Sequence, residues 1–276
     1  MRLVKELGDV NACITLPVSF MQGGAYAEID ELRLLIDSGS ATTIVSAAAA
    51  SARQLGAPGH RATLSSQGLS LSCSVASPLQ ALPPGVDGIL GVDSLKGYQA
   101  VELDWAAPEL RLHTAPLTDD SEEIASMPLF FRRVAGGELP FVRASFEGGS
   151  CSELDGLVDT GSPVTMITPE LASEAALDLG ALAEDADIIT TGVDGQPTRM
   201  RATLCRAIAL GDPMADEPTI NHAGATVYTG KCPMMAKVGW EGSPAALLGL
   251  DVLRMNAATS GRLVLDFGRG RLKCLK

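Results

Sequence analysis

The two halves of the chain carry the same short motifs in the same order. An apolar segment ends in Asp-Ser-Gly-Ser at 34–40, and a second apolar segment ends in Asp-Thr-Gly-Ser at 157–162. Each is followed by Thr-x-Val or Thr-x-Ile, by helix-forming residues, by a Leu-Gly pair and by a hairpin pattern. Because such an ordered repeat rarely arises by chance, we expect one structural plan to be used twice, in two lobes.

The spacing of the motifs indicates where the two halves differ. Asp37 and Asp159 are 159 − 37 = 122 residues apart, whereas Gly91 and Gly249 of the two Leu-Gly pairs are 249 − 91 = 158 residues apart. The second half therefore has about 158 − 122 = 36 additional residues between its Asp motif and its Leu-Gly pair. This insertion contains a stretch typical of a hairpin tip, Gly192-Val193-Asp194-Gly195, between β-branched residues.

Local patterns predict an all-β fold with a few short helices. Apolar segments that partly alternate and end at Gly or Pro are typical of strands. Ser46 is a good N-cap for a helix beginning at Ala47. Thr168 followed by Pro169 predicts the start of a second helix, which we expect to end near Gly180.

The repeat also predicts where the chain divides. We expect an N-terminal lobe at 1–117 and a C-terminal lobe at 128–276. The stretch between them, 118–127, is acidic and has no apolar period, so we interpret it as a linker. A chain of 276 residues is long enough for two such lobes, each with its own core.

The duplicated motif resembles that of the pepsin and retropepsin clan of aspartic peptidases. The resemblance covers nearly the whole chain, because each half has both an Asp motif and a Leu-Gly pair. It implies two β-barrel-like lobes related by a pseudo-twofold axis, with Asp37 and Asp159 as the catalytic pair in the cleft between them. Two carboxyl groups at such a short distance share one proton, and the pair activates a water molecule without a metal or cofactor.

The resemblance also implies roles for the residues beside the two aspartates. The hydroxyl groups of Ser38 and Thr160 would bond across the pseudo-twofold axis, Gly39 and Gly161 would let backbone N–H groups approach the carboxyl groups, and Ser40 and Ser162 would orient the outer carboxyl oxygens. The pairs Leu90-Gly91 and Leu248-Gly249 would pass beneath the two loops and brace them.

One feature departs from the pattern of this clan. Pepsin-like enzymes carry a substrate-covering flap with a tyrosine on the first lobe, whereas the first half of this chain has only a short Ser65-Ser66-Gln67-Gly68 stretch there. The better candidate is Gly192, Val193, Asp194 and Gly195 in the second half. We therefore expect one dominant flap, on the C-terminal lobe.

Composition excludes several other functions. The net charge is −12 and is spread along the chain, which argues against a nucleic-acid partner and against an anionic membrane surface. No segment approaches the roughly 20 apolar residues of a membrane-spanning helix, and the N-terminal residues lack the apolar region of a signal peptide. Because no signal peptide or spanning segment is found in this sequence, we expect a cytoplasmic protein. We expect it to act as a monomer, because both halves of the site lie in one chain. Its expected substrate is an extended peptide or protein.

The remaining polar residues have structural interpretations. Six scattered cysteines without a C-x-x-C pair favour buried free thiols, and metal-ligand spacing is absent. The three histidines share no pattern. Asp104 and Asp266 precede hairpin turns and are expected to be structural, and Asp93 and Asp251 are expected to cap short helices.

Two alternatives to a peptidase stay open at this stage. A catalytically quiet relative could use the cleft to hold an extended peptide as an added strand. An actin-like phosphotransferase is the second alternative, because Asp-x-Gly-Ser/Thr also opens phosphate loops in that fold. The latter predicts long helices, which the sequence does not clearly show.

Overall fold

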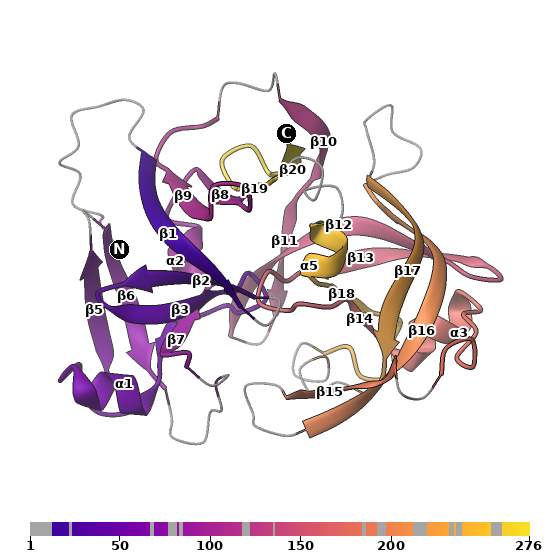
Figure 1. Ribbon diagram of the computed structural model, residues 1–276, viewed down its shortest axis with the longest axis horizontal. Coiled ribbons are helices and arrows are strands. Elements are labelled where there is room, and N and C mark those ends of the chain that lie inside the picture. Colours follow the sequence, from indigo (N-terminus) through magenta and orange to yellow (C-terminus); the bar gives the residue numbers. More distant parts are fainter. Residues whose placement is uncertain are drawn as a thin grey trace.

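The computed structural model has two β-rich lobes side by side, with a sheet between them that both halves share (Figure 1). The structure describes residues 13–21, 24–66, 69–76, 82, 85–117, 122–134, 136–183, 186–191, 197–211, 220–231, 235, 239–254 and 261–276.

The described residues of the first half form nine strands and two short helices: β1 (Cys13–Met21), β2 (Gly24–Ile29), β3 (Leu32–Ile36), β4 (Ile44–Val45), α1 (Ala47–Ala52), β5 (Arg61–Ser66), β6 (Leu69–Val75), β7 (Gly88–Leu90), α2 (Val92–Leu95), β8 (Ala100–Asp104) and β9 (Glu109–His113).

The second half repeats this order with additions: β10 (Glu123–Pro128), β11 (Phe130–Val134), β12 (Gly137–Glu147), β13 (Cys151–Val158), β14 (Met166–Ile167), α3 (Pro169–Glu174), β15 (Ile188–Thr191), β16 (Pro197–Leu210), β17 (Ile220–Thr229), β18 (Ala246–Leu248), α5 (Leu250–Leu253), β19 (Arg262–Asp266) and β20 (Arg271–Leu275). Among the described helices, the longest have six residues, so the long helices of an actin-like fold are not found in that part of the chain.

Strand pairing confirms the predicted repeat. In the first lobe β3 runs parallel to β7, and β4 pairs with β7 antiparallel and with β6 parallel. In the second lobe β13, β18, β14 and β17 make the same pairings in the same order. The predicted terminal hairpins are also present, as β8–β9 and β19–β20.

The insertion in the second half lengthens one sheet. The hairpin β16–β17 of the second lobe corresponds to β5–β6 of the first, because β17 and β6 each run parallel to the strand after the Asp motif. β16 has 14 residues where β5 has six, and β15 pairs along its beginning. Among the described residues, β15 has no counterpart in the first lobe.

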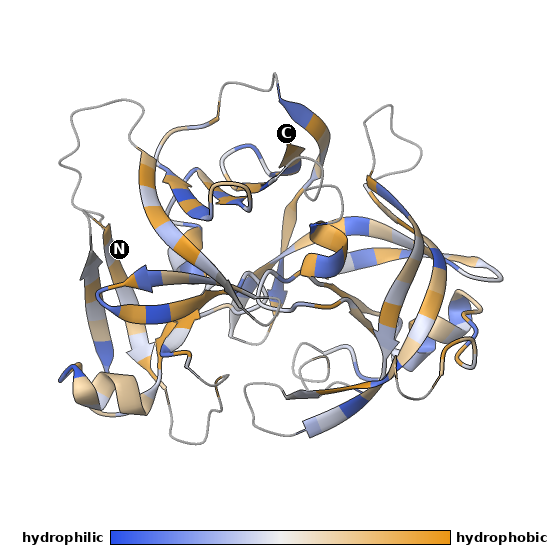
Figure 2. Ribbon diagram, viewed as in Figure 1, coloured by the Kyte–Doolittle hydropathy of each residue, from blue (hydrophilic) through white to orange (hydrophobic). Residues whose placement is uncertain are grey.

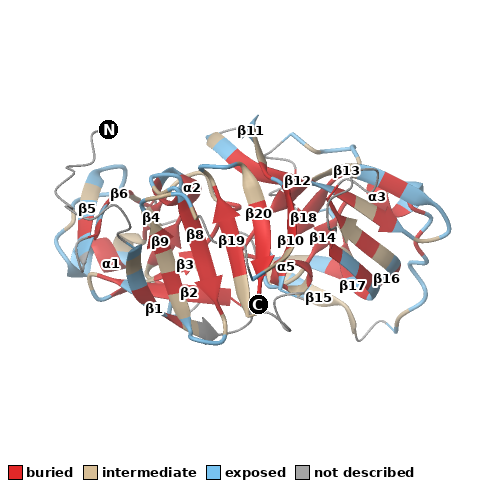
Figure 3. Cartoon of the chain, turned by 90° about the horizontal axis from the view of Figure 1, so that it is seen from above, coloured by how far each residue is buried: buried red, intermediate tan, exposed pale blue. Residues whose placement is uncertain are grey.

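The stretch predicted to be a linker is in part a strand. β10 spans Glu123–Pro128 and pairs antiparallel with β20 at the far end of the chain. β19 pairs in turn with β8, so one sheet runs in the order β10-β20-β19-β8-β9-β1 through both halves. Its strands β8, β19 and β20 are buried along nearly their whole length (Figure 3). The lobe boundaries at 117 and 128 stay a prediction.

Helix α3 ends earlier than the sequence predicts. Thr168 caps its start, and its hydroxyl accepts a hydrogen bond from the N–H of Leu171. The helix stops at Glu174 instead of continuing toward Gly180. Leu177 then packs in the core, and Asp178 forms a bridge to Leu204 of β16. These tertiary contacts therefore override the local preference for helix.

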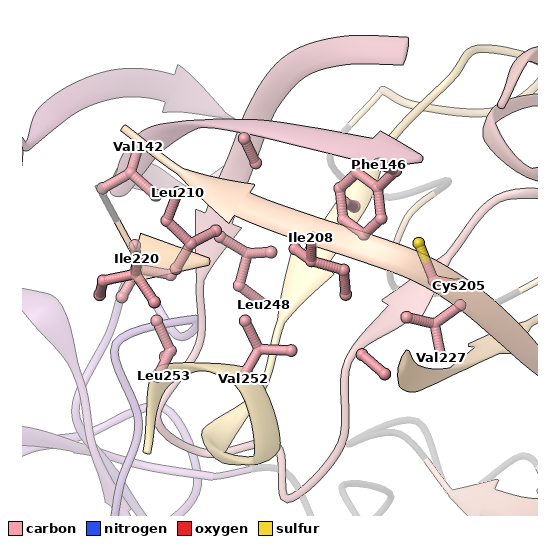
Figure 4. Packing of buried hydrophobic residues seen from close by; sticks show 14 of the residues in the cluster. Val142, Phe146, Cys205, Ile208, Leu210, Ile220, Val227, Leu248, Val252 and Leu253 are labelled. Carbon is pink, nitrogen blue, oxygen red and sulfur yellow. The ribbon is translucent and has the colours of Figure 1, made fainter. Parts of the chain in front are cut away.

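Each lobe has its own apolar core. Hydrophilic and hydrophobic bands alternate along strands such as β16 (Figure 2), as half-buried sheets require. The core of the second lobe lies between β12, β16, β17, β18 and α5, where ten of its residues are labelled in Figure 4: Val142, Phe146, Cys205, Ile208, Leu210, Ile220, Val227, Leu248, Val252 and Leu253.

Candidate active site

Two equivalent loops carry the predicted aspartates. Asp37 follows β3, and Asp159 follows β13. The N–H of Asp37 donates to the carbonyl of Leu90 at 3.0 Å, and the N–H of Asp159 donates to the carbonyl of Leu248 at the same distance. Both side chains are buried, with residue exposures of 6% for Asp37 and 4% for Asp159.

The structure brings the two carboxyl groups into direct contact. They are hydrogen-bonded to each other although they lie 122 residues apart in the chain. Each also accepts a bond from a glycine of its own loop: Gly39 N to Asp37 Oδ1 at 2.8 Å, and Gly161 N to Asp159 Oδ1 at 2.9 Å.

The same two glycines are required by the close approach of the opposite loop. A Cβ atom on Gly39 would lie 2.7 Å from Asp159 Oδ1, and one on Gly161 would lie 2.7 Å from Asp37 Oδ1. Both distances are too short for van der Waals contact, so any larger residue would push the aspartates apart. This is a packing requirement, separate from the backbone freedom for which glycine is often needed.

Burial and mutual repulsion shape the titration of the pair. Desolvation raises the pKa of both carboxyl groups, because the charged form is disfavoured away from water. The neighbouring charge of Asp159 raises the pKa of Asp37 further, to well above its usual range. Backbone N–H bonds from the glycines act in the opposite direction. The pair therefore retains a proton at pH values where isolated carboxyl groups are ionised, and its titration belongs to both residues together.

Ser38 and Thr160 join the two loops with four buried hydrogen bonds. The hydroxyl of Ser38 donates to the carbonyl of Val158 at 2.7 Å and accepts from the N–H of Thr160 at 3.0 Å. The hydroxyl of Thr160 donates to the carbonyl of Ile36 at 2.9 Å and accepts from the N–H of Ser38 at 3.0 Å. The arrangement is reciprocal, as a pseudo-twofold axis between the loops requires.

Ser40 and Ser162 contact the aspartates through the backbone. Their hydroxyl groups donate to the carbonyls of Thr42 and Val164, at 3.0 and 2.7 Å, and so close their own loops. Their N–H groups donate to the backbone carbonyls of Asp37 and Asp159, both at 3.3 Å. These N–H groups also lower the pKa of the two carboxyl groups, whereas the serine hydroxyls, which were expected to orient the outer carboxyl oxygens, bond within their own loops.

The Leu-Gly pairs run beneath the loops as expected. The N–H of Gly91 donates to the Thr43 hydroxyl, and the N–H of Gly249 donates to the Thr165 hydroxyl, both at 3.0 Å. The next residue, Val92, donates from its N–H to the carbonyl of Ser40 at 2.8 Å. Each loop is thus fixed from below at several points.

The interpretation of Asp93 and Asp251 as helix caps is confirmed only in part. The N-cap positions of α2 and α5 are glycines without a side-chain cap bond, but Asp251 Oδ1 accepts from the N–H of Val252 in the first turn of α5 at 2.8 Å. Asp93 instead accepts bonds from the N–H and hydroxyl of Thr43, both at 2.7 Å. Asp251 does the same for Thr165, at 2.9 and 2.7 Å.

These Thr–Asp pairs are site-supporting residues that sequence reasoning missed. Each pair links the loop that carries Asp37 or Asp159 to the helix after the Leu-Gly motif. The signal was present in the sequence, because the same threonine and the same aspartate recur at equivalent positions of both repeats.

Asp104 and Asp266 are structural, as predicted. Asp104 Oδ1 accepts from the N–H groups of Ala106 and Ala107, both at 2.9 Å, and Asp266 Oδ1 accepts from Arg269 N at 3.0 Å. Each carboxylate stabilises the turn of its hairpin.

The flap candidate is described only in its strands. Gly192, Val193, Asp194 and Gly195 lie outside the described residues, as does the tip of the β5–β6 hairpin. Ile188 of β15 and Met200 of β16, which are paired in register, pack in one apolar cluster with Met166 and Leu247. The base of this hairpin is therefore attached to the strands that support the Asp159 loop.

Two further properties concern the described part of the chain. It contains no group of three or more His, Cys, Asp or Glu side chains placed to hold a metal ion. None of the helices described is long and apolar enough to cross a membrane.

Comparison with known proteins places the fold. Neither a family model nor a curated protein matches the sequence. Among solved structures, the chain is similar to an aspartic proteinase from Irpex lacteus, with a TM-score of 0.55 and 16% identity over 96% of this chain and 97% of the other. It is also similar to Basic 7S globulin from soybean, with a TM-score of 0.55 and 12% identity over 96% of each chain.

A third similar structure is that of EDGP, with a TM-score of 0.51 and 11% identity over 97% of this chain and 95% of the other. Only the first of these proteins is named as a proteinase, so the likeness concerns the fold and not the activity. The chain therefore has the two-lobed, all-β fold of the pepsin-like aspartic peptidases.

Proposed function

We propose that this protein is an aspartic endopeptidase that hydrolyses peptide bonds with a water molecule activated by Asp37 and Asp159. The single observation that carries the proposal is the pair of buried carboxyl groups, one from each lobe, hydrogen-bonded to each other. A chain that used these loops only for structure would have no need to bury two like charges together, because that arrangement is costly.

The proposed mechanism uses the one proton that the pair retains. The ionised carboxylate takes a proton from a water molecule bound between the two groups, while the protonated carboxyl donates a hydrogen bond to the oxygen of the scissile carbonyl. The water oxygen attacks the carbonyl carbon, the protonated carboxyl passes its proton to the carbonyl oxygen, and a tetrahedral diol forms. The carboxyl that took the water proton then gives it to the leaving nitrogen, and the other carboxylate takes a proton from one hydroxyl of the diol. The C–N bond breaks, and the pair again holds one proton. Both aspartates come from one chain, so a monomer suffices.

We further propose that the substrate is an extended peptide covered from the C-terminal lobe. β15 and the long β16 support this, because the described part of the first lobe has no equivalent strand pair. Replacing residues 192–196 by a two-residue Asn-Gly turn should raise KM at least tenfold and leave the titration of the pair unchanged. An unchanged KM would contradict this role.

The test of the dyad is cleavage of a denatured protein mixture across pH 3–7, followed by mass spectrometry of the new termini. We expect cleavage by the wild-type protein and its loss, by a factor of at least about 1,000, in Asp37→Asn and Asp159→Asn. Asp30→Asn is the matched control: Asp30 is remote from the dyad in a turn with φ of 53°, a conformation that asparagine tolerates well.

The outcomes separate the two remaining functions. Cleavage that survives in either dyad variant would refute the mechanism. A wild-type protein that cleaves nothing at any pH, yet binds an extended peptide, would instead identify a peptide-binding relative. The soybean globulin and EDGP have a similar fold but are not named as proteinases, which supports a peptide-binding relative as the alternative.

A further inference from the structure

A second cluster of chemically active side chains lies on the sheet that the two halves share. Cys13 of β1 is directly opposite His113 of β9 in the antiparallel register. Residues paired in this way have Cβ atoms about 4.5–5.5 Å apart, and the Cys13 thiol is hydrogen-bonded to the His113 imidazole. Cys13 is exposed, so its sulfur can be reached from solvent.

A buried carboxylate holds the histidine in place. His113 Nε2 lies 2.9 Å from Oε2 of Glu102, on the neighbouring strand β8. The Glu102 side chain is only 4% exposed and that of His113 only 16%. The other oxygen of Glu102 is bound by Arg111 of β9 at 2.6 Å and by Arg262 of β19 at 3.4 Å, so the carboxylate is held from both neighbouring strands.

The order of groups is therefore sulfur, imidazole, carboxylate, which is the arrangement of an activated nucleophile. Burial opposes protonation of His113, but its hydrogen bonds to Cys13 and Glu102 outweigh burial and raise its pKa to about 9. The imidazole is thus positively charged at neutral pH, and it lies opposite an exposed sulfur atom. The other charged groups around this face are Asp104 on β8, Glu109 and Arg111 on β9, and Arg262 on β19.

We propose that Cys13, His113 and Glu102 form a reactive-thiol site at which the Cys13 sulfur attacks small disulfides. The Cys13 sulfur forms a new S–S bond with one sulfur of the disulfide, and the original S–S bond breaks. The second sulfur leaves as a thiolate with its electron pair and is protonated by solvent. The product is a mixed disulfide on Cys13, and no oxidant other than the disulfide is consumed. This site lies outside the dyad and goes beyond the proposed peptidase activity.

The other cysteines in the described part of the chain are either buried or lie opposite a negative group. Cys73, Cys205 and Cys274 are buried, and burial raises the pKa of each thiol. Cys151 is exposed like Cys13, but the residue opposite it on the neighbouring strand is Glu147, a negative group. Cys151 therefore serves as an internal control that is also exposed but lies opposite a residue of the opposite charge.

The experiment uses 5,5′-dithiobis(2-nitrobenzoic acid) on the native full-length protein at pH 7, with the modified cysteines located by mass spectrometry over time. We expect Cys13 to react about ten times faster than Cys151, because the positive His113 opposite Cys13 stabilises negative charge on the attacking sulfur, whereas the negative Glu147 opposite Cys151 opposes it. In His113→Gln, which keeps a hydrogen-bonding side chain without the charge, the two rates should become equal within about twofold. Equal rates in the wild-type protein, or a ratio unchanged in His113→Gln, would overturn the proposal.

If His113→Gln fails to fold, the ratio of the Cys13 and Cys151 reaction rates in the wild-type protein, measured over a range of pH, tests the same role of His113. The advantage of Cys13 over Cys151 should disappear as the pH rises through about 9, because His113 then loses its proton. An advantage that came only from exposure would persist unchanged to pH 10, and that result would refute a role for the imidazole.

Discussion

Replacing Ser38 by alanine tests whether the hydroxyl bonds between the two loops stabilise the site. The side chain is fully buried, and its hydroxyl makes two of the four bonds across the pseudo-twofold axis. Ser38→Ala removes both bonds and leaves the Val158 carbonyl and the Thr160 N–H without those partners. The two bonds of the Thr160 hydroxyl remain, so the loops stay connected on one side.

The expected loss follows from the two groups left unpaired. A buried donor or acceptor without a partner costs about 1–3 kcal/mol, so Ser38→Ala should lower the free energy of unfolding by about 3–4 kcal/mol. The matched control is Thr160→Ser, which keeps all four bonds and removes one buried methyl group. That change should cost only about 1 kcal/mol. Ser38→Thr is a second control, expected to be tolerated because it keeps the hydroxyl.

The measurement is urea-induced unfolding at pH 7, followed by the fluorescence of Trp105 and Trp240. A difference of at least 2 kcal/mol between Ser38→Ala and Thr160→Ser would agree with the expected value. If Ser38→Ala lost no more stability than Thr160→Ser, the hydroxyl bonds would be energetically unimportant, and the contact between the loops would have to come from apolar packing.

Two further predictions concern the dyad itself. In Asp37→Asn we expect a higher stability than wild type at pH 7: the folded pair binds a proton more tightly than the unfolded chain, so wild-type stability falls as the pH rises above about 4. This gain should vanish below pH 4 in urea titrations, and a gain that did not change with pH would contradict the assignment. Gly161→Ala should reduce peptidase activity by about 100-fold, because its methyl group would lie 2.7 Å from Asp37 Oδ1. Gly180→Ala, whose methyl would have an ordinary 3.4 Å contact, should leave activity unchanged in the same assay.

Local sequence signals identified much of the fold. The N-cap of α1 is Ser46, whose side chain accepts from Ala49 N, and that of α3 is Thr168. Both were predictable because a cap acts on amides only two or three residues away. The hairpins β8–β9 and β19–β20 were predictable for a similar reason, since a short turn sets their register. The duplicated Asp motif then indicated that two such sets of elements form two lobes.

The failures all involve partners far apart in the chain. β10 pairs with β20, about 145 residues away, and nothing in its acidic sequence indicates this pairing. Asp93 binds Thr43, which is 50 residues earlier, and Asp251 binds Thr165, which is 86 residues earlier. Helix α3 stops early because its next residues contact β16 and the core. In each case a contact made only after the sheets close decides the local structure.

The repeated motifs already imply that the same set of elements is used twice and that each copy has a buried strand ending in an aspartate. Turn residues, caps and apolar patterns act over a few residues, so they can be recognised without coordinates. The contact between Asp37 and Asp159, the support of their loops by Thr–Asp pairs and the position of Cys13 opposite His113 depend on the folded chain. These contacts form across sheets whose pairing depends on the packing of the whole chain, and their free energy comes from groups that no local pattern brings together.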